Sequence, residues 1–497
     1  MQFIGAQPTV DLTYSDVFLV PRRSGVSSRL EVDLAPRDGT PATIPLVAAN
    51  MNAVTGPRLA ATLARRGGLG VLPQDLSLQH TLHAVRWVKL QPVACDTPFV
   101  LPPEATAADA LRQLPPVPGY GVVVAERGGS APVGDESALR REQVLGMLSA
   151  ARLASAPDDA RLGDLIHSEP RAIGLAELGE GRAAFDAVHA IEAQQPGDEP
   201  MGVVDADRFV GTVTWRSALR NALYRPALDA RGRLAVAVAV GINGDVAGKA
   251  RAFAEAGVDA LVIDTAHGHQ EGMIRALETM SALDLGLPII AGNVVTADGV
   301  RDLVSAGATI LKVGVGPGAM CTTRMMTAVG RPQFSAVLET AQAARELGAH
   351  VWADGGVRYP RDVALALAAG AASVMVGSWF AGTIEAPGEL QVDEQGRHYK
   401  VSWGMASTKA VQERFAGLDA YEQARKALFA EGISDSKIYL DPQRPGVEDL
   451  VDMITSGVRS SFTYAGAATL QEFHVRAHVG LQSAAGYEEG KALPVSW

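Results

Sequence analysis

The segment KVGVGPGAMCTTR, which begins at Lys312, contains the side chain best suited to covalent chemistry. Its three glycines let the backbone adopt conformations that other residues rarely take, and so turn polar groups toward a ligand or an ion. Cys321 follows them, and Thr322, Thr323 and Arg324 could stabilise a thiolate or pass protons. The segment predicts a cysteine nucleophile on an exposed loop, although a small apolar residue in a glycine-rich turn would give the same pattern.

Two further loops follow apolar segments and carry residues suited to a phosphate and ribose site. ADGGVR (353–358) has Asp354 beside two glycines, and VGSWF (376–380) has Gly377 and Ser378. Backbone N–H groups of such loops bind phosphate, and Asp354 is free to bind ribose hydroxyls. IDTAHGHQ (263–270) places Asp264 after another apolar segment. No cysteine or further histidine cluster joins its two histidines, so we expect no transition-metal site there.

The segments before these loops predict the elements that position them. A helix end, Ala-Gly, small residues and an apolar strand recur at 252–264, 303–314 and 365–377. Strands apolar on both faces that alternate with helices are typical of a parallel sheet covered by helices. Further apolar strands at 44–49, 68–72, 234–240, 288–293 and 350–356 bring the count to eight. Eight strands predict an α/β fold, a (β/α)8 TIM barrel, and an open doubly wound sheet is the alternative.

A long insertion separates the second predicted strand from the third. It contains two similar units, and each has an extended stretch, a helix, a strand and a second helix. The closing strand and helix are QVLGMLSAARL (143–153) in one unit and RFVGTVTWRSALR (208–220) in the other. We therefore expect residues 1–92 and 226–497 to form the barrel, with its flap and C-terminal segment, and residues 93–225 to form an inserted pair of repeats.

The composition narrows the class of protein. The 497 residues are 47% hydrophobic and 20% charged, which is typical of a globular chain. The net charge is −11 and no basic run is present, so we expect no nucleic-acid binding. Cys95 and Cys321 cannot form a disulfide framework, and nothing at the N-terminus resembles a signal peptide, so we expect a cytoplasmic protein. Glycines divide the uncharged stretch 363–384 into a helix, a turn and a strand, and we expect no membrane span.

The motifs GVGPGAMCTTR, AGNVVT, WADGGVR, VGSWFAGTIEAPGE and WGMAST resemble the family that contains IMP dehydrogenase and GMP reductase. The resemblance covers nearly the whole barrel, and the cysteine loop is its most specific part. It implies a purine nucleotide, GMP or IMP, attacked at C2 by the cysteine beside a nicotinamide cofactor. The inserted repeats resemble the tandem CBS units of many IMP dehydrogenases, which implies purine nucleotide effectors such as ATP and GTP. The family also implies a homotetramer or octamer.

The resemblance assigns roles to matching residues of this chain. Cys321 would be the nucleophile, and Thr323 and Glu389 would handle protons. The substrate would be bound by Asp354 at the ribose, by Gly356, Gly377 and Ser378 at the phosphate, and by the backbone of Gly404 and Met405 at the purine. The cofactor would lie against Asp264, Thr265, Asn293 and Arg324. Backbone carbonyls of Gly316, Gly318 and Cys321 would bind a potassium ion.

The two branches of the family differ in how the covalent intermediate is resolved. A dehydrogenase needs a water activated by an Arg-Tyr pair on a flap, but here Arg414 is followed by Phe415, whose ring cannot relay a proton. PRRSGVSSRLEVDL (21–34) and SSFTYAGA (460–467) also resemble reductases.

These features favour GMP reductase with NADPH in purine salvage. IMP dehydrogenase with NAD is the first alternative and a catalytically dead nucleotide sensor the second. The chain departs from both branches at Gln74, where the family usually has lysine, and at Ala319, where it usually has serine.

Overall fold

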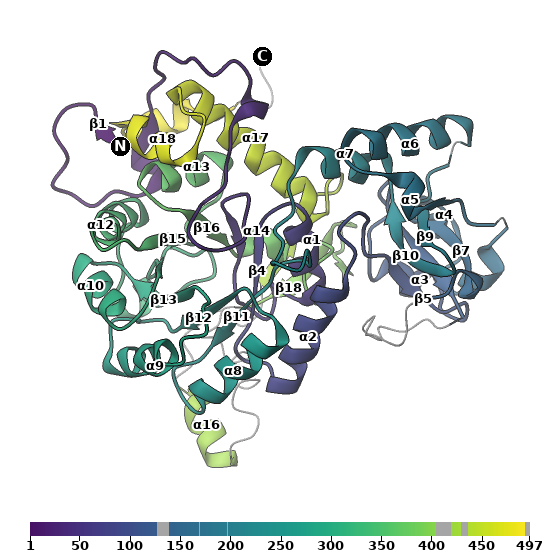
Figure 1. Cartoon of the computed structure of the whole chain (residues 1–497), viewed down its shortest axis with the longest axis horizontal. Helices are drawn as coiled ribbons and strands as arrows, with labels where there is room; N and C mark the ends of the chain where they lie inside the picture. The colour runs from purple at the N-terminus through teal and green to yellow at the C-terminus, as the bar shows by residue number, and fades with distance from the viewer. Residues whose placement is uncertain (127–138, 168, 196, 404–418, 429–435, 493–497) are drawn as a thin grey trace.

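The computed structural model describes residues 1–126, 139–167, 169–195, 197–403, 419–428 and 436–492. Its largest part is a closed barrel of eight parallel strands, as the sequence predicts (Figure 1). Around the barrel the strands are β3 (Leu46–Ala48), β4 (Leu69–Leu72), β11 (Ala237–Val240), β12 (Ala260–Asp264), β13 (Ile289–Val294), β14 (Ile310–Val313), β15 (His350–Asp354) and β16 (Ser373–Val376). Pairing of Met375 in β16 with Val47 in β3 closes the barrel.

The apolar character of the strands explains the barrel, because every residue of β11, β14 and β16 is buried. The repeated helix-Gly-strand pattern also forms as predicted. Gly257, Gly307 and Gly370 end their helices with φ of 89°, 114° and 115°, which glycine adopts without strain. The helices packed around the barrel are α1 (Pro57–Arg65), α2 (Leu78–Leu90), α8 (Val246–Ala256), α9 (Glu271–Ser281), α10 (Ala297–Ser305), α12 (Gln333–Glu346), α13 (Pro360–Ala368) and α17 (Val447–Ala465).

The chain leaves the barrel after α2 and returns before β11, and the segment between forms two repeats of one topology. The first sheet contains β5 (Phe99–Leu101), β6 (Gly121–Ala125) and β7 (Val144–Ser149), and the second contains β8 (Ala172–Gly174), β9 (Met201–Asp205) and β10 (Arg208–Val213). In both, the first pair of strands is parallel and the second pair antiparallel. The accompanying helices are α3 (Ala107–Leu111), α4 (Ala150–Ser155), α5 (Leu175–Leu178), α6 (Gly181–Gln194) and α7 (Trp215–Leu223).

Smaller elements surround the barrel. One sheet has the order β1 (Gln2–Phe3), β20 (His478–Leu481), β2 (Val17–Leu19), and another has the order β17 (Gln391–Val392), β18 (His398–Ser402), β19 (Ser436–Tyr439). The other α-helices of the described residues are α11 (Thr323–Thr327), α14 (Ser378–Ala381), α16 (Ala420–Leu428), α18 (Leu470–Arg476) and α19 (Ala484–Glu489). Residues 363–384 form parts of α13, β16 and α14. Within the described ranges, the chain has no helix both long and apolar enough to span a membrane.

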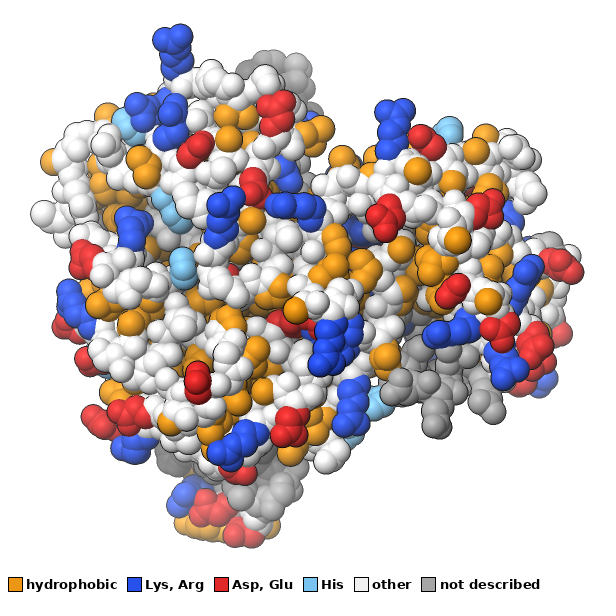
Figure 2. Space-filling model, in the orientation of Figure 1, with side chains coloured by type: hydrophobic (Ala, Val, Ile, Leu, Met, Phe, Trp, Pro, Cys, Tyr) orange, Lys and Arg blue, Asp and Glu red, His pale blue; other side chains and the backbone are white. Residues whose placement is uncertain are grey.

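A buried network of charges, the junction network, joins the second repeat to the barrel. Arg220 in α7 pairs with Glu448 at 3.1 Å, Asp449 at 2.6 Å and Asp452 at 2.8 Å, all in α17. Arg66, which is fully buried, pairs with Glu448 from the barrel side at 2.6 Å. Buried charges need such partners, so the network fixes how the insertion sits on α17. On the face shown in Figure 2, by contrast, Lys and Arg side chains are interspersed with Asp and Glu.

Candidate active site

The predicted nucleophile lies on the loop after β14, at the carboxyl end of the barrel strands. Cys321 is exposed, and its Sγ donates a hydrogen bond to Oγ1 of Thr323 at 3.3 Å. The Cys321 N–H donates to the carbonyl of Gly318 at 3.0 Å. An accessible thiol beside a hydroxyl group is suited to attack on a bound ligand. Cys95, in contrast, is buried in the core of the second repeat, and burial raises its pKa to about 12.

The cysteine loop packs directly against the loop after β15. A side chain at Gly314 would collide with the carbonyl oxygen of Asp354, and a Cβ at Gly356 would lie 3.2 Å from Cβ of Pro317. Gln333 is buried at the start of α12 and donates from Nε2 to the carbonyl of Asp354 at 3.2 Å and to a carbonyl of β14 at 2.7 Å. The predicted ribose and phosphate residues therefore lie beside the cysteine loop.

The loop after β16 extends this side of the site. β15 and β16 are neighbours, with Asp354 paired to Met375. Gly377 follows β16 directly, and Ser378 is the first residue of α14. The predicted phosphate ligands on the two loops therefore come from adjacent strand ends, the arrangement that TIM barrels use for phosphate.

Three of the predicted cofactor residues, Asp264, Thr265 and Asn293, lie at or after the ends of β12 and β13, on the other side of the cysteine loop. Asp264 ends β12, and the Thr265 carbonyl accepts a hydrogen bond from the backbone N–H of Asn293 at 2.9 Å. Asn293 donates from Nδ2 to the carbonyl of Gly314 and to Asp354 Oδ2 at 2.9 Å, while its buried Oδ1 has no partner among the described residues. A Cβ at Gly316 would collide with the Arg324 side chain, so Arg324 lies against the cysteine loop. The unpaired Asn293 oxygen fits a carboxamide donor such as that of nicotinamide.

Lys312 in β14 belongs to the site but was not singled out from the sequence. Its Nζ lies 3.1 Å from Asp264 Oδ1 and forms a second ion pair with Asp354 Oδ2. Burial acts to lower the pKa of this ammonium group, but the two carboxylates raise it above its ordinary value. The sequence does contain a signal for this residue, which is a lysine within an otherwise apolar strand. A charge buried in such a strand must be paired, so acidic partners could have been expected.

Several of the predicted site residues are not placed beside the cysteine loop by the described structure. Glu389 is exposed, and the next residue, Leu390, donates its backbone N–H to the carbonyl of Arg112 in the insertion. Among the described residues none is hydrogen-bonded or ion-paired to Glu389, so its partnership with Thr323 stays a prediction. The predicted purine contacts Gly404 and Met405, and the flap pair at 414–415, lie outside the described residues.

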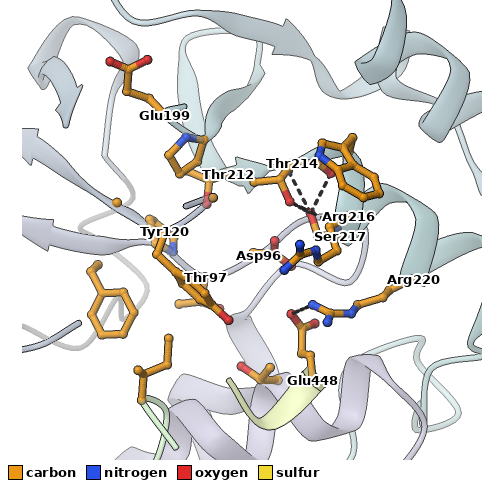
Figure 3. A pocket seen from close by; sticks show the side chains of 18 of the residues that line it. Asp96, Thr97, Tyr120, Glu199, Thr212, Thr214, Arg216, Ser217, Arg220 and Glu448 are labelled. Carbon is orange, nitrogen blue, oxygen red and sulfur yellow. Dashed lines mark hydrogen bonds and ion pairs between the residues drawn. The ribbon is translucent and has the colours of Figure 1, made fainter. Parts of the chain in front are cut away.

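A second candidate site is a cleft of about 320 Å³ between the two repeats and the barrel. Tyr120 and Thr97 line it on one side, and Thr212, Thr214 and Arg216 on another (Figure 3). The second repeat approaches the cleft through the N-terminus of α7, where Thr214 accepts a hydrogen bond from the N–H of Ser217 at 3.1 Å. The cleft is large enough for a small molecule, and aromatic groups and hydroxyls line it.

The barrel side of this cleft carries a buried acid. Glu385 accepts a hydrogen bond from the backbone N–H of Val447 at 2.9 Å. Burial, followed by the charges of Glu448 and Asp449, raises the pKa of Glu385 to about 7. The Glu385 carboxyl therefore gains or loses its proton at a pH close to neutral.

The model of the IMP dehydrogenase / GMP reductase domain matches residues 11–492. The chain belongs to this family. The family model thus covers both halves of the barrel and the insertion, and confirms the resemblance carried by the cysteine loop.

Both branches of the family are represented among the similar proteins. The GMP reductase of Mycobacterium tuberculosis is 53% identical over the full length of both chains. The inosine-5'-monophosphate dehydrogenase of Streptococcus pyogenes is 36% identical, with 96% of this chain and 94% of that protein covered. Among solved structures, a cysteine-to-alanine GMP reductase of Trypanosoma brucei in complex with guanosine 5'-monophosphate matches with a TM-score of 0.66 and 29% identity, covering 98% of this chain and 99% of that chain.

Proposed function

We propose that the chain is a GMP reductase that converts GMP to IMP and ammonia with NADPH. The observation that carries this assignment is the 53% identity to a GMP reductase along the entire chain, against 36% to a dehydrogenase. The contact of the cysteine loop with the loop that holds Asp354 supports it, because a nucleotide bound at Asp354 would lie beside the loop that carries the thiol.

Cys321 is proposed to act as the nucleophile. Attack of its thiolate on C2 of GMP forms a C–S bond, and protonation of the 2-amino group lets ammonia leave as the C–N bond breaks. A hydride delivered to C2 then breaks the C–S bond and returns the thiolate, leaving IMP. Thr323 accepts the hydrogen bond of the thiol in the resting site, which places its hydroxyl where the proton is removed.

NADPH supplies the hydride when it is bound. The residues that would hold it are Asp264, Thr265, Asn293 and Arg324, and the unpaired Oδ1 of Asn293 is the atom that fits its carboxamide. A potassium ion would be held by the carbonyls of Gly316, Gly318 and Cys321. The carbonyl of Gly318 also accepts the Cys321 N–H, so ion binding there would stiffen the turn that carries the thiol.

Product analysis tests the assignment. Incubation with GMP and NADPH is expected to yield IMP and ammonia in equal amounts, separated by chromatography and measured by an ammonia assay. Formation of XMP from IMP and NAD, without IMP production from GMP, would assign the chain to the dehydrogenase branch instead.

We further propose that the insertion is a CBS pair that binds a purine nucleotide in the cleft between its repeats. The hydroxyls of Thr212 and Thr214 and the guanidinium of Arg216 line this cleft and can bind phosphate or ribose. The junction network connects the same repeat to α17 of the barrel, so a nucleotide that favours one arrangement of the repeats has a route to the enzyme. A homotetramer or octamer stays the expected assembly.

A further inference from the structure

Lys312 lies inside the barrel at the centre of a polar network. Its side chain is 4% exposed and bridges Asp264 at the end of β12 and Asp354 at the end of β15. Gly292 in β13 leaves room for it, because a Cβ there would lie 2.5 Å from Cβ of Lys312. Asn50 completes the network by donating to Asp264 Oδ2 at 2.8 Å.

The two carboxylates are held differently. Both oxygens of Asp264 are engaged, Oδ1 by Lys312 and Oδ2 by Asn50. Oδ2 of Asp354 accepts hydrogen bonds from both Lys312 and Asn293, whereas its Oδ1 accepts none from any described residue. Two donors on one oxygen fix the carboxylate plane, and the other oxygen is left as an acceptor.

We propose that Lys312 is a positioning residue for GMP, which holds Asp354 by one oxygen so that the other accepts the ribose hydroxyls. It also compensates the charges of two carboxylates that would otherwise repel each other. This inference rests on the proposed function, since it takes Asp354 as the ribose ligand.

Removal of the ammonium group tests the proposal. In Lys312→Met the two carboxylates lose their shared cation, and Asp354 loses one of the two donors on its Oδ2. We expect the Kd of GMP, measured by calorimetry without cofactor, to rise about tenfold or more, as expected for a lost charged interaction.

A second substitution separates positioning from charge compensation. Lys312→Met combined with Asp264→Asn removes the repelling charge but leaves Asp354 without the donor on Oδ2, so GMP affinity should recover only in part. If Lys312 acted only by compensating charge, the double variant would regain the wild-type Kd of GMP. If Lys312→Met does not fold, Lys312→Gln and the double variant give the same comparison.

The chain offers a matched control in Lys89. This lysine is 3% exposed in its side chain and lies between two aspartates, Asp229 at 3.1 Å and Asp259 at 2.7 Å, near the amino end of β12. Lys89→Met should lower the melting temperature without changing the Kd of GMP. An unchanged GMP affinity in Lys312→Met, or a double variant that regains the wild-type Kd of GMP, overturns the positioning role. Because binding is measured without turnover, these results are independent of whether the wild-type protein reduces GMP.

Discussion

The Sγ atom of Cys321 donates a hydrogen bond to Oγ1 of Thr323 at 3.3 Å, on a loop that packs against Asp354. This relationship joins the two halves of the proposed chemistry. The proposed nucleophile follows β14 and the proposed ribose ligand ends β15, and these two strands are neighbours in the barrel. The barrel thus places the loop of the proposed nucleophile beside the proposed ribose ligand.

Loss of the thiol should stop the reaction. Cys321→Ser is expected to reduce NADPH oxidation with GMP by about a thousandfold or more, because a serine alkoxide is far rarer at neutral pH than a thiolate. GMP binding, measured by calorimetry, should change little. Turnover near the wild-type rate in this variant would exclude the covalent mechanism.

Loss of the ribose acceptor should weaken binding more than chemistry. Asp354→Asn places an amide where an ionised oxygen accepts hydroxyls, and the KM for GMP should rise about tenfold. The preference for GMP over its 2′- and 3′-deoxy analogues should shrink in parallel. Asp298→Asn, whose side chain is exposed on α10, is the control. Undiminished discrimination against both analogues in Asp354→Asn would remove Asp354 from the ribose site.

The cleft of the insertion should respond to a change in its basic side chain. Arg216→Ala is expected to weaken the effect of ATP or GTP on GMP turnover about tenfold, because a guanidinium contact with phosphate is lost. Arg182→Ala on α6 removes an exposed arginine that does not line the cleft and should leave the effect intact. Equal nucleotide responses in both variants would place the effector elsewhere or leave the insertion as a scaffold.

The pH dependence of stability should report the buried acid Glu385. Its pKa is about 7 in the folded chain against 4.5 for an ordinary glutamate, so unfolding releases a proton between these values. The contribution of Glu385 to the free energy of unfolding therefore falls as the pH rises from about 4.5 to 7, by roughly 3 kcal/mol at most. The melting temperature, measured across this pH range, should fall less in Glu385→Gln than in the wild-type protein. Glu394→Gln, at an exposed position, should behave like the wild-type protein. Identical pH profiles for Glu385→Gln and the wild-type protein would contradict the assignment.

The barrel could be predicted because its signals are local. Each repeated strand is apolar on both faces and follows a glycine that ends a helix, as at Gly257 before β12, so chain neighbours alone define the element. Cys321 and Thr323 were likewise singled out from neighbouring positions in one loop, and a hydrogen bond joins their side chains, while their catalytic roles stay predictions. The predicted choice of the reductase branch agrees with the full-length similarity to GMP reductase.

Long-range contacts could not be predicted in the same way. Lys312 is separated by 48 residues of sequence from Asp264 and by 42 from Asp354, and only the closed barrel brings the three together. Arg220 lies 229 positions from Asp449, so the junction network depends on how the insertion folds back onto α17. Glu389 was assigned from a motif alone, and the described structure places its neighbour Leu390 against the insertion.

The most direct test of the proposed reaction compares initial rates for four pairs, GMP with NADPH, GMP with NADH, IMP with NAD and IMP with NADP, in the wild-type protein and in Cys321→Ala. We expect turnover of GMP with NADPH by the wild-type protein, no appreciable oxidation of IMP, and loss of the GMP reaction in the variant. Steady oxidation of IMP with NAD, with no consumption of NADPH on GMP, would contradict the assignment.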